Sequence, residues 1–219
     1  FVFSNQRNTM RKVTDPQIKF LGENKLFITD ATVSKLLIQN QRPVAEQPKD
    51  IIDLNELENA LNSNSMIKKA EVFMSINGEL SAEIEQKRPI ARVNTNASYY
   101  IDDEGSSMPL SSNYSARVPL VTGNIKKNEL ETVFKFAKTV DKDEFLKKHV
   151  IEIRQNYDKT IDFKIRKSEF IVHLGTLNKL EKKINNFKAF YQKAMKDKIL
   201  ENYSVVNLKF DKQVICTQK

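Results

Sequence analysis

The sequence predicts an α+β protein in two parts, a small unit with the order β-α-α-β-β followed by a larger mixed α/β domain. Apolar residues recur at helical spacing in some segments and alternate with polar residues in others, which indicates both helices and strands. The 219 residues are 40% hydrophobic with only 5 Gly and 6 Pro, which is typical of one or two compact domains. The single cysteine, Cys216, excludes an internal disulfide framework and a Cys-rich zinc site.

The small unit begins with an extended segment at 13–20, in which Pro16 suits an edge strand. Thr29 is the predicted N-cap of a first helix. Asp53 is the predicted N-cap of a second helix, and Glu56 completes a capping box three residues later. A loop rich in Gln, Pro and Asn joins the two helices.

A hairpin ends the small unit. Apolar and polar residues alternate over 70–76 and again over 80–84, on either side of Asn77-Gly78. This dipeptide predicts a two-residue type I′ turn, because both central positions of that turn need positive φ angles. We therefore expect a three-stranded sheet with both helices on one face.

The larger domain is expected to contain an antiparallel sheet and two helices. Strands are predicted within 93–101 and 118–121, with a tight turn at 102–105 between them. Apolar positions from Leu130 to Val140 predict the first of the two helices.

In the rest of this domain, apolar and polar residues alternate in several segments. Three successive alternating segments predict an antiparallel meander, at 151–153, 161–165 and 170–174. Thr176 is then the predicted cap of an amphipathic helix that extends to about residue 196. Final strands are predicted at 206–210 and 214–216, with a turn near Asp211-Lys212.

The charge is concentrated in the second half of the chain. Residues 1–123 carry a net charge of −1, and residues 124–219 carry +9. A basic half can meet nucleic acid, an anionic membrane surface or an acidic protein. No apolar run reaches the roughly 18 residues that span a bilayer. Because the sequence opens at Phe1 without a Met, we expect a preceding segment, either a membrane anchor or a signal.

The sequence contains no recognisable catalytic constellation. It lacks nucleotide-binding, metalloprotease and serine-hydrolase motifs. His149 and His173 are predicted to be structural, the acidic residues at 102–104 are typical of a turn, and Cys216 is expected to be inert. The lysines of the last helix predict a solvated face, and they are Lys179, Lys182, Lys183 and Lys193. We therefore expect a protein without enzymatic activity, metal or cofactor.

Several segments together resemble a known family. They are 86–93, 99–102 with Gly105, 108–110, 118–123 and 206–210. In this order and spacing they resemble the extracytoplasmic part of the FtsQ/DivIB family of bacterial cell-division proteins, in a Bacteroidetes-like form. The resemblance implies a juxta-membrane linker at 1–10, a POTRA domain at 11–89 and a partner-binding β-domain at 90–219.

The resemblance also implies a function. Such proteins are non-catalytic scaffolds that cross the inner membrane once and place these domains in the periplasm. There they recruit FtsB and FtsL to the divisome, and the POTRA domain contacts other divisome members. The resemblance implies no cofactor and no nucleic-acid partner.

In the family, FtsB adds a strand to the last strand of the sheet, beside an aromatic residue. The resemblance assigns Phe210 as the apolar anchor and Lys209 as the partner of an acidic residue on FtsB. Val214, Ile215, Cys216 and Thr217 supply the pairing edge. On pattern alone, Phe210 fits equally well as a core aromatic of an alternating strand.

Two alternatives remain open at this point. A POTRA-bearing component of outer-membrane assembly or secretion would also contain the small unit, but it would need further repeats or a strand-rich barrel downstream. A basic nucleic-acid-binding protein would use residues 124–219, and its affinity would fall steeply with salt.

Overall fold

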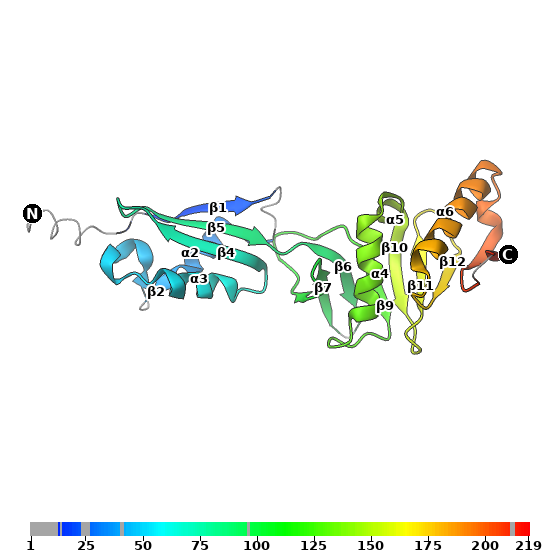
Figure 1. Ribbon diagram of the computed structural model, residues 1–219, viewed down its shortest axis with the longest axis horizontal. Coiled ribbons are helices and arrows are strands. Elements are labelled where there is room, and N and C mark those ends of the chain that lie inside the picture. Colours follow the sequence, from blue (N-terminus) through cyan, green and yellow to red (C-terminus); the bar gives the residue numbers. More distant parts are fainter. Residues whose placement is uncertain (1–12, 14, 23–26, 40–41, 96, 211–212) are drawn as a thin grey trace, which may run out of the picture. The chain divides into compact units, whose positions relative to one another are not determined.

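The computed structural model describes residues 13, 15–22, 27–39, 42–95, 97–210 and 213–219 (Figure 1). The predicted linker at 1–10 and the turn near Asp211-Lys212 lie outside these residues. The chain forms two compact units, which are described separately. Unit 1 comprises Phe1–Arg88 with Pro109–Ser115, and unit 2 comprises Pro89–Met108 with Ala116–Lys219. The division at 11–89 and 90–219 stays a prediction.

Unit 1 has the predicted order β-α-α-β-β. Its three-stranded sheet has the order β1-β5-β4, in which β1 (Gln17–Leu21) is parallel to β5 (Leu80–Gln86) and β4 (Ile67–Met74) is antiparallel to it. Two helices, α2 (Asp30–Leu36) and α3 (Leu54–Asn62), lie on one side of this sheet (Figure 1). Apolar side chains from both layers form the core, among them Val33, Leu57, Leu61, Leu80 and Ile84.

Both helix caps of unit 1 were correctly predicted. The Thr29 side chain accepts a hydrogen bond from the Thr32 N–H, and the Asp53 carboxylate accepts from the N–H groups of Asn55 and Glu56. These side chains satisfy N–H groups that have no partner inside the helix.

The connection between α2 and α3 is ordered by two buried glutamines. It contains β2 (Ile38–Gln39), β3 (Arg42–Pro43) and the 3-10 turns η1 (Val44–Glu46) and η2 (Lys49–Ile51). Gln47 Nε2 donates to the carbonyl oxygens of Gln39 (2.6 Å) and Arg42 (3.0 Å). The Gln39 side chain donates to the Ile51 carbonyl (3.2 Å) and accepts from the Asp53 N–H (3.0 Å).

The β4–β5 hairpin is confirmed, but its turn differs from the predicted type. Gly78 has φ +85°, whereas Asn77 is not among the described residues with positive φ. The Gly78 N–H donates to the Ser75 carbonyl (3.0 Å), and the Ser75 N–H donates to the Glu79 carbonyl (2.9 Å). These bonds define a turn with Ile76 and Asn77 at its centre, followed by Gly78 as a bulge.

Unit 2 is built on a mixed sheet of nine strands in the order β14-β13-β12-β11-β10-β9-β6-β7-β8. The strands are β6 (Pro89–Asn94), β7 (Ser98–Asp102), β8 (Ser107–Met108), β9 (Leu120–Gly123), β10 (Val150–Gln155), β11 (Ile161–Ile165), β12 (Ile171–Gly175), β13 (Tyr203–Asn207) and β14 (Ile215–Gln218). The helical segments are α4 (Glu131–Lys142), α5 (Glu144–His149), α6 (Leu180–Lys196) and the 3-10 turn η3 (Leu200–Asn202).

The mixed α/β class is confirmed, with two differences in detail: the sheet is mixed rather than antiparallel throughout, and a third helix, α5, accompanies the two expected ones. The predicted meander of β10, β11 and β12 is antiparallel, whereas β9 pairs with β10, β6 with β9 and β12 with β13 in parallel. Helical crossovers cause two of these parallel pairs, because a chain that crosses through a helix re-enters the sheet in the same direction. The third helix, α5, is too short to show an apolar stripe.

The last helix begins later than predicted. α6 starts at Leu180 after Lys179, which has φ 53° and makes no side-chain cap, so the predicted Thr176 cap is wrong. Lys183, predicted on a solvated face, is 6% exposed. Its ammonium donates to the carbonyl oxygens of Leu174 (3.0 Å) and Thr176 (2.8 Å), where β12 ends.

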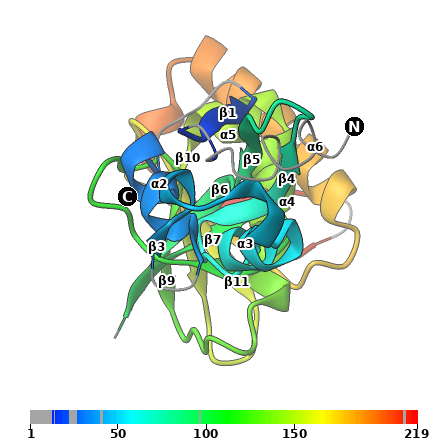
Figure 2. The ribbon, with the colours of Figure 1, turned by 90° about the vertical axis from the view of Figure 1, so that its left-hand side faces the viewer.

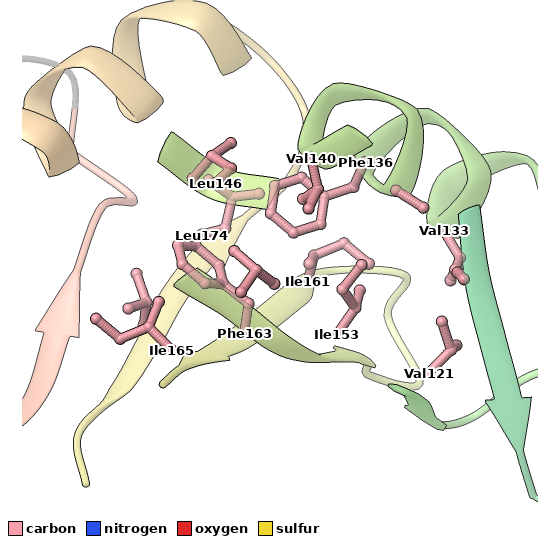
Figure 3. Packing of buried hydrophobic residues seen from close by; sticks show 14 of the residues in the cluster. Val121, Val133, Phe136, Val140, Leu146, Ile153, Ile161, Phe163, Ile165 and Leu174 are labelled. Atoms are coloured by element: carbon pink, nitrogen blue, oxygen red, sulfur yellow. The ribbon is translucent and has the colours of Figure 1, made fainter. Parts of the chain in front are cut away.

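The core of unit 2 lies between its helices and one face of the sheet. Figure 3 shows Phe136 and Val140 of α4, Leu146 of α5 and Phe163 of β11 directed toward one another. The Phe136 and Phe163 rings have centroids 5.4 Å apart. This packing holds the helices against the sheet.

Candidate protein-docking site

β14 is the terminal strand of the sheet in unit 2. It pairs antiparallel with β13, with Val206 opposite Cys216 and Asn207 opposite Ile215. The Ser204 hydroxyl lies 3.2 Å from the carbonyl oxygens of Thr217 and Gln218, which adds side-chain bonds to the ladder. Among the described strands, none lies on the other side of β14. This side of the strand can therefore accept the backbone of another chain.

Phe210 lies outside the core. β13 ends at Asn207, before the end of the strand predicted at 206–210. Leu208, the next residue, is buried, and its N–H donates to the His173 carbonyl (2.9 Å). The Asn207 side chain then accepts from the Lys209 N–H (3.0 Å), which turns the chain out of the sheet. As a result, Phe210 is 47% exposed.

Lys209 lies over the end of β12. Gly175 has φ +74°, and a Cβ at that position would come within 2.9 Å of Lys209 Cγ, so the lysine stem covers the glycine. Hydrogen bonds from Thr160 lower the pKa of Asp158, and the charge of Lys209 lowers it further.

A groove of about 770 Å³ borders β14. Its lining comes from the C-terminal half of α6, from Ile199 and Tyr203, and from the last strand, and it consists of Phe190, Lys193, Ala194, Ile199, Tyr203, Val214, Cys216, Thr217 and Gln218. The rings of Phe190 and Tyr203 meet edge to face with centroids 5.5 Å apart. Lys193 is the charged residue of this lining, so the groove suits an apolar side chain with an acidic neighbour.

The structure places three of the six predicted partner-binding residues in the lining of the groove, to which Lys209 and Phe210 do not belong. Val214, Cys216 and Thr217 line the groove, while Ile215 is 40% exposed. Burial raises the pKa of the Cys216 thiol above its ordinary value, which keeps the thiol protonated and unreactive at neutral pH.

Sequence reasoning did not find the groove residues of α6 and β13. Phe190 belongs to the apolar stripe of a helix, and Tyr203 belongs to a strand with alternating residues. In the sequence, both positions therefore look like those of core residues. In the structure both side chains are only partly buried, packed against the core of unit 2.

The other candidate residues have structural partners. The Nδ1 of His173 lies 2.7 Å from the Asp162 carboxylate, and the Nδ1 of His149 lies 2.7 Å from the Phe145 carbonyl. Asp102 accepts hydrogen bonds from the N–H groups of Glu104 (3.1 Å) and Ser106 (2.7 Å), as expected for a turn. Within the described residues, no group of three or more His, Cys, Asp or Glu side chains is arranged to hold a metal ion.

Comparison with known families gives two matches. Residues 88–217, more than half of the chain, match the family described as FtsQ/DivIB, C-terminal related. Residues 18–85 match the POTRA-like domain. No curated protein matches the chain.

Proposed function

Since the chain belongs to the FtsQ/DivIB C-terminal related family and carries a POTRA-like domain, we propose that it is a non-catalytic scaffold of the bacterial divisome. In this proposal, unit 2 recruits FtsB-like and FtsL-like proteins. The partner adds a strand to β14 and thereby extends the nine-stranded sheet.

The observation that carries this proposal is the position of β14. It is one of the two edge strands of the sheet, and a groove lined mainly by apolar side chains runs beside it. Backbone hydrogen bonds along the strand supply affinity without selecting a sequence, whereas the groove can select a side chain of the partner. Both elements of strand addition are thus present on one surface.

Each predicted residue has a role in this arrangement. Phe210 supplies an exposed aromatic ring, the kind of residue that often dominates the energy of an interface. Lys209 attracts an acidic side chain of the partner. The main chain of Val214, Ile215, Cys216 and Thr217 pairs with the added strand.

The proposed location is the periplasm, with a single membrane-spanning segment N-terminal to Phe1. In the part of the chain that the structure describes, no helix has the length and apolarity needed to cross a bilayer. The family assignment supports this location, and it also supports contacts between unit 1 and further divisome proteins.

Phe210→Ala tests the assignment of the anchor. We expect it to weaken binding of the periplasmic segment of an FtsB-like protein by at least about tenfold in titration calorimetry, because a buried aromatic anchor typically contributes about 2 kcal/mol. Circular dichroism should show an unchanged fold, since Phe210 is 47% exposed.

Phe73→Ala is the matched control, because Phe73 is 48% exposed and lies on β4 of unit 1. It should bind the FtsB-like segment as the unaltered chain does. Equal affinities for the unaltered chain and for Phe210→Ala would exclude Phe210 as the anchor.

A further inference from the structure

The backbone groups of β14 point alternately toward β13 and away from it. In an antiparallel ladder, the N–H and C=O groups of one residue face one side of the strand, and those of the next residue face the other side. The Lys219 N–H donates to the last carbonyl oxygen of η3 (2.9 Å), on the β13 side of the strand. Thr217 and Ile215, two and four residues earlier, therefore also face β13. Cys216 and Gln218 direct their N–H and C=O groups away from it.

The hydrogen bonds on the other side of β13 lead to the same alternation. The Leu208 N–H donates to a carbonyl oxygen of β12 (2.9 Å). Asn207, the preceding residue, therefore faces β14, where it lies opposite Ile215, and Val205 likewise lies opposite Thr217. The irregularity of this ladder is an extra residue in β13, before Val205, so the alternation along β14 is intact.

The outward groups of β14 lie on the open side of the sheet. Among the described strands, none lies beyond β14, so the N–H groups of Cys216 and Gln218 and the Cys216 carbonyl face this side. The Gln218 carbonyl differs, because the Ser204 hydroxyl lies 3.2 Å from it. The described strand β14 therefore offers an added strand two backbone donors and one backbone acceptor.

The same residues direct their side chains to the groove. Successive side chains of a strand point to opposite faces, so Val214, Cys216 and Gln218 share one face. All three line the groove, and Val214 and Cys216 pack against the core of unit 2. Ile215 lies between them, points to the other face and is 40% exposed. A partner residue opposite Cys216 therefore bonds to β14 and places its side chain over the groove.

The groove combines an apolar wall with a positive charge. The rings of Phe190 and Tyr203 form part of the wall, and Lys193 lies in the last turn of α6. Side chains two residues apart on an added strand lie on the same face, about 7 Å from each other. An acidic side chain two positions from the groove residue is therefore placed to meet the Lys193 ammonium.

We propose that the partner strand binds β14 through the main chain of Cys216 and Gln218. The partner residue opposite Cys216 has an apolar side chain that enters the groove, and an Asp or Glu two positions away lies beside Lys193. This inference rests on the proposed strand addition at β14, and it limits the bonding residues of that edge to alternate positions. A slip of one residue would turn the apolar side chain to the other face, so the ladder and the groove select the same register.

Residue-resolved amide exchange, measured by NMR on the 219-residue chain, tests the register. With a saturating FtsB-like periplasmic segment, exchange at Cys216 and Gln218 should slow by about tenfold or more, because their N–H groups gain partners. Ile215 and Thr217 should change little. Residues 70 and 72 of β4 are the internal reference, because α3 lies beside this strand (Figure 2) and its side chains already accept from their N–H groups (2.8 and 3.2 Å).

Lys193→Glu tests the charge in the groove. It should weaken binding of the segment about tenfold in titration calorimetry, because two negative charges would then face each other. Lys196→Glu is the matched control, since Lys196 lies in the same last turn of α6 but outside the lining of the groove, and it should keep the affinity. A Lys in place of the acidic residue of the segment should restore binding to the Lys193→Glu chain and weaken binding to the unaltered chain.

The possible results separate this inference from the docking proposal. Slower exchange at Ile215 and Thr217 instead of Cys216 and Gln218 would overturn the register and leave strand addition intact. Equal losses for the two lysine variants, or no rescue by the exchanged charge, would overturn the assignment of Lys193. Unchanged exchange along the whole of β14 with saturating segment would overturn the docking proposal, and this inference with it.

Discussion

Gly123 shows how a single residue allows two strands of unit 2 to approach closely, and Gly22 of unit 1 provides the contrast. Gly123 ends β9 with φ +91°, and a Cβ at this position would lie 2.2 Å from the Gln155 carbonyl oxygen. Gly22 has a similar φ of +84°, but a Cβ there would meet nothing within 4 Å. A side chain would therefore be strained at both positions, but only at Gly123 would it also collide with a neighbouring strand.

The difference in the room for a side chain leads to a prediction about stability. Gly123→Ala should lower the free energy of unfolding by roughly 2–4 kcal/mol, because β9 must separate from β10, whereas Gly22→Ala should cost about 1 kcal/mol. Urea denaturation of both variants measures these changes. Equal losses for the two would show that β9 does not approach β10 this closely.

Asp143 joins three elements of unit 2. Its carboxylate caps α5 by accepting from the Leu146 N–H (3.0 Å), and it forms an ion pair with Lys188 of α6. Burial alone would raise the pKa of Asp143, but hydrogen bonds from Lys188 and Leu146 lower it more, so the net pKa lies below the ordinary value of 3.8.

A lowered pKa means that the carboxylate stabilises the folded state when it is ionised. This contribution is fully present above the ordinary pKa and is lost as the pH falls through the lowered pKa of the folded state. Asp143→Asn should therefore lower stability by about 1 kcal/mol at pH 7. The difference from the unaltered chain should shrink below about pH 4 in thermal melts, and a constant difference down to pH 2 would contradict this account.

Side chains cover the edge strand β4 of unit 1, unlike the edge strand β14 of unit 2. On the outer side of β4, the Asn62 side chain bonds both the N–H (2.8 Å) and the carbonyl (3.2 Å) of Ala70. Glu58 accepts from the Val72 N–H (3.2 Å). Side chains of α3 therefore occupy backbone groups that another strand would need, which blocks strand addition at this edge.

Removing this protection should expose β4. Glu58→Ala combined with Asn62→Ala is expected to produce dimers or larger species at high protein concentration, measured by light scattering after size-exclusion chromatography. Asn55→Ala, an exposed change on the same helix, should leave the chain unaffected. A double variant that stays monomeric would show that the two side chains do not guard the edge.

Short sequence motifs predicted the individual helices and strands better than they predicted which strands pair with one another. The caps at Thr29 and Asp53 were predictable because a cap depends on residues close in sequence. The Thr176 cap failed because the chain makes a left-handed turn at Lys179 before α6 begins. The parallel pairing of β12 with β13 depends on where α6 returns the chain, and no short motif encodes that return.

The candidate site was predicted only in part, for the same reason. The resemblance to FtsQ/DivIB proteins pointed to the last strand and to Phe210. The groove wall formed by Phe190 and Tyr203 could not be predicted, because two distant segments meet there. Pattern alone also could not show that Asn207 turns the chain out of the sheet and leaves Phe210 exposed.

At the scale of the whole molecule, residues 124–219 keep a net charge of +9, although several of their lysines form local ion pairs. On the helices, Lys135 pairs with Glu131 (2.7 Å) and Lys147 with Asp141 (3.0 Å), while Lys188 pairs with Asp143. These pairs leave the net excess in place, so charge alone does not distinguish an acidic protein partner from nucleic acid.

The measurement that bears most directly on the docking proposal is amide hydrogen exchange of the chain with and without an FtsB-like periplasmic segment. Strand addition predicts slower exchange at residues 215–218 when the segment is bound, because their outward N–H groups gain partners. The β4 edge at 67–74 should keep its exchange rates. Unchanged exchange at 215–218 under saturating segment would show that the partner binds elsewhere.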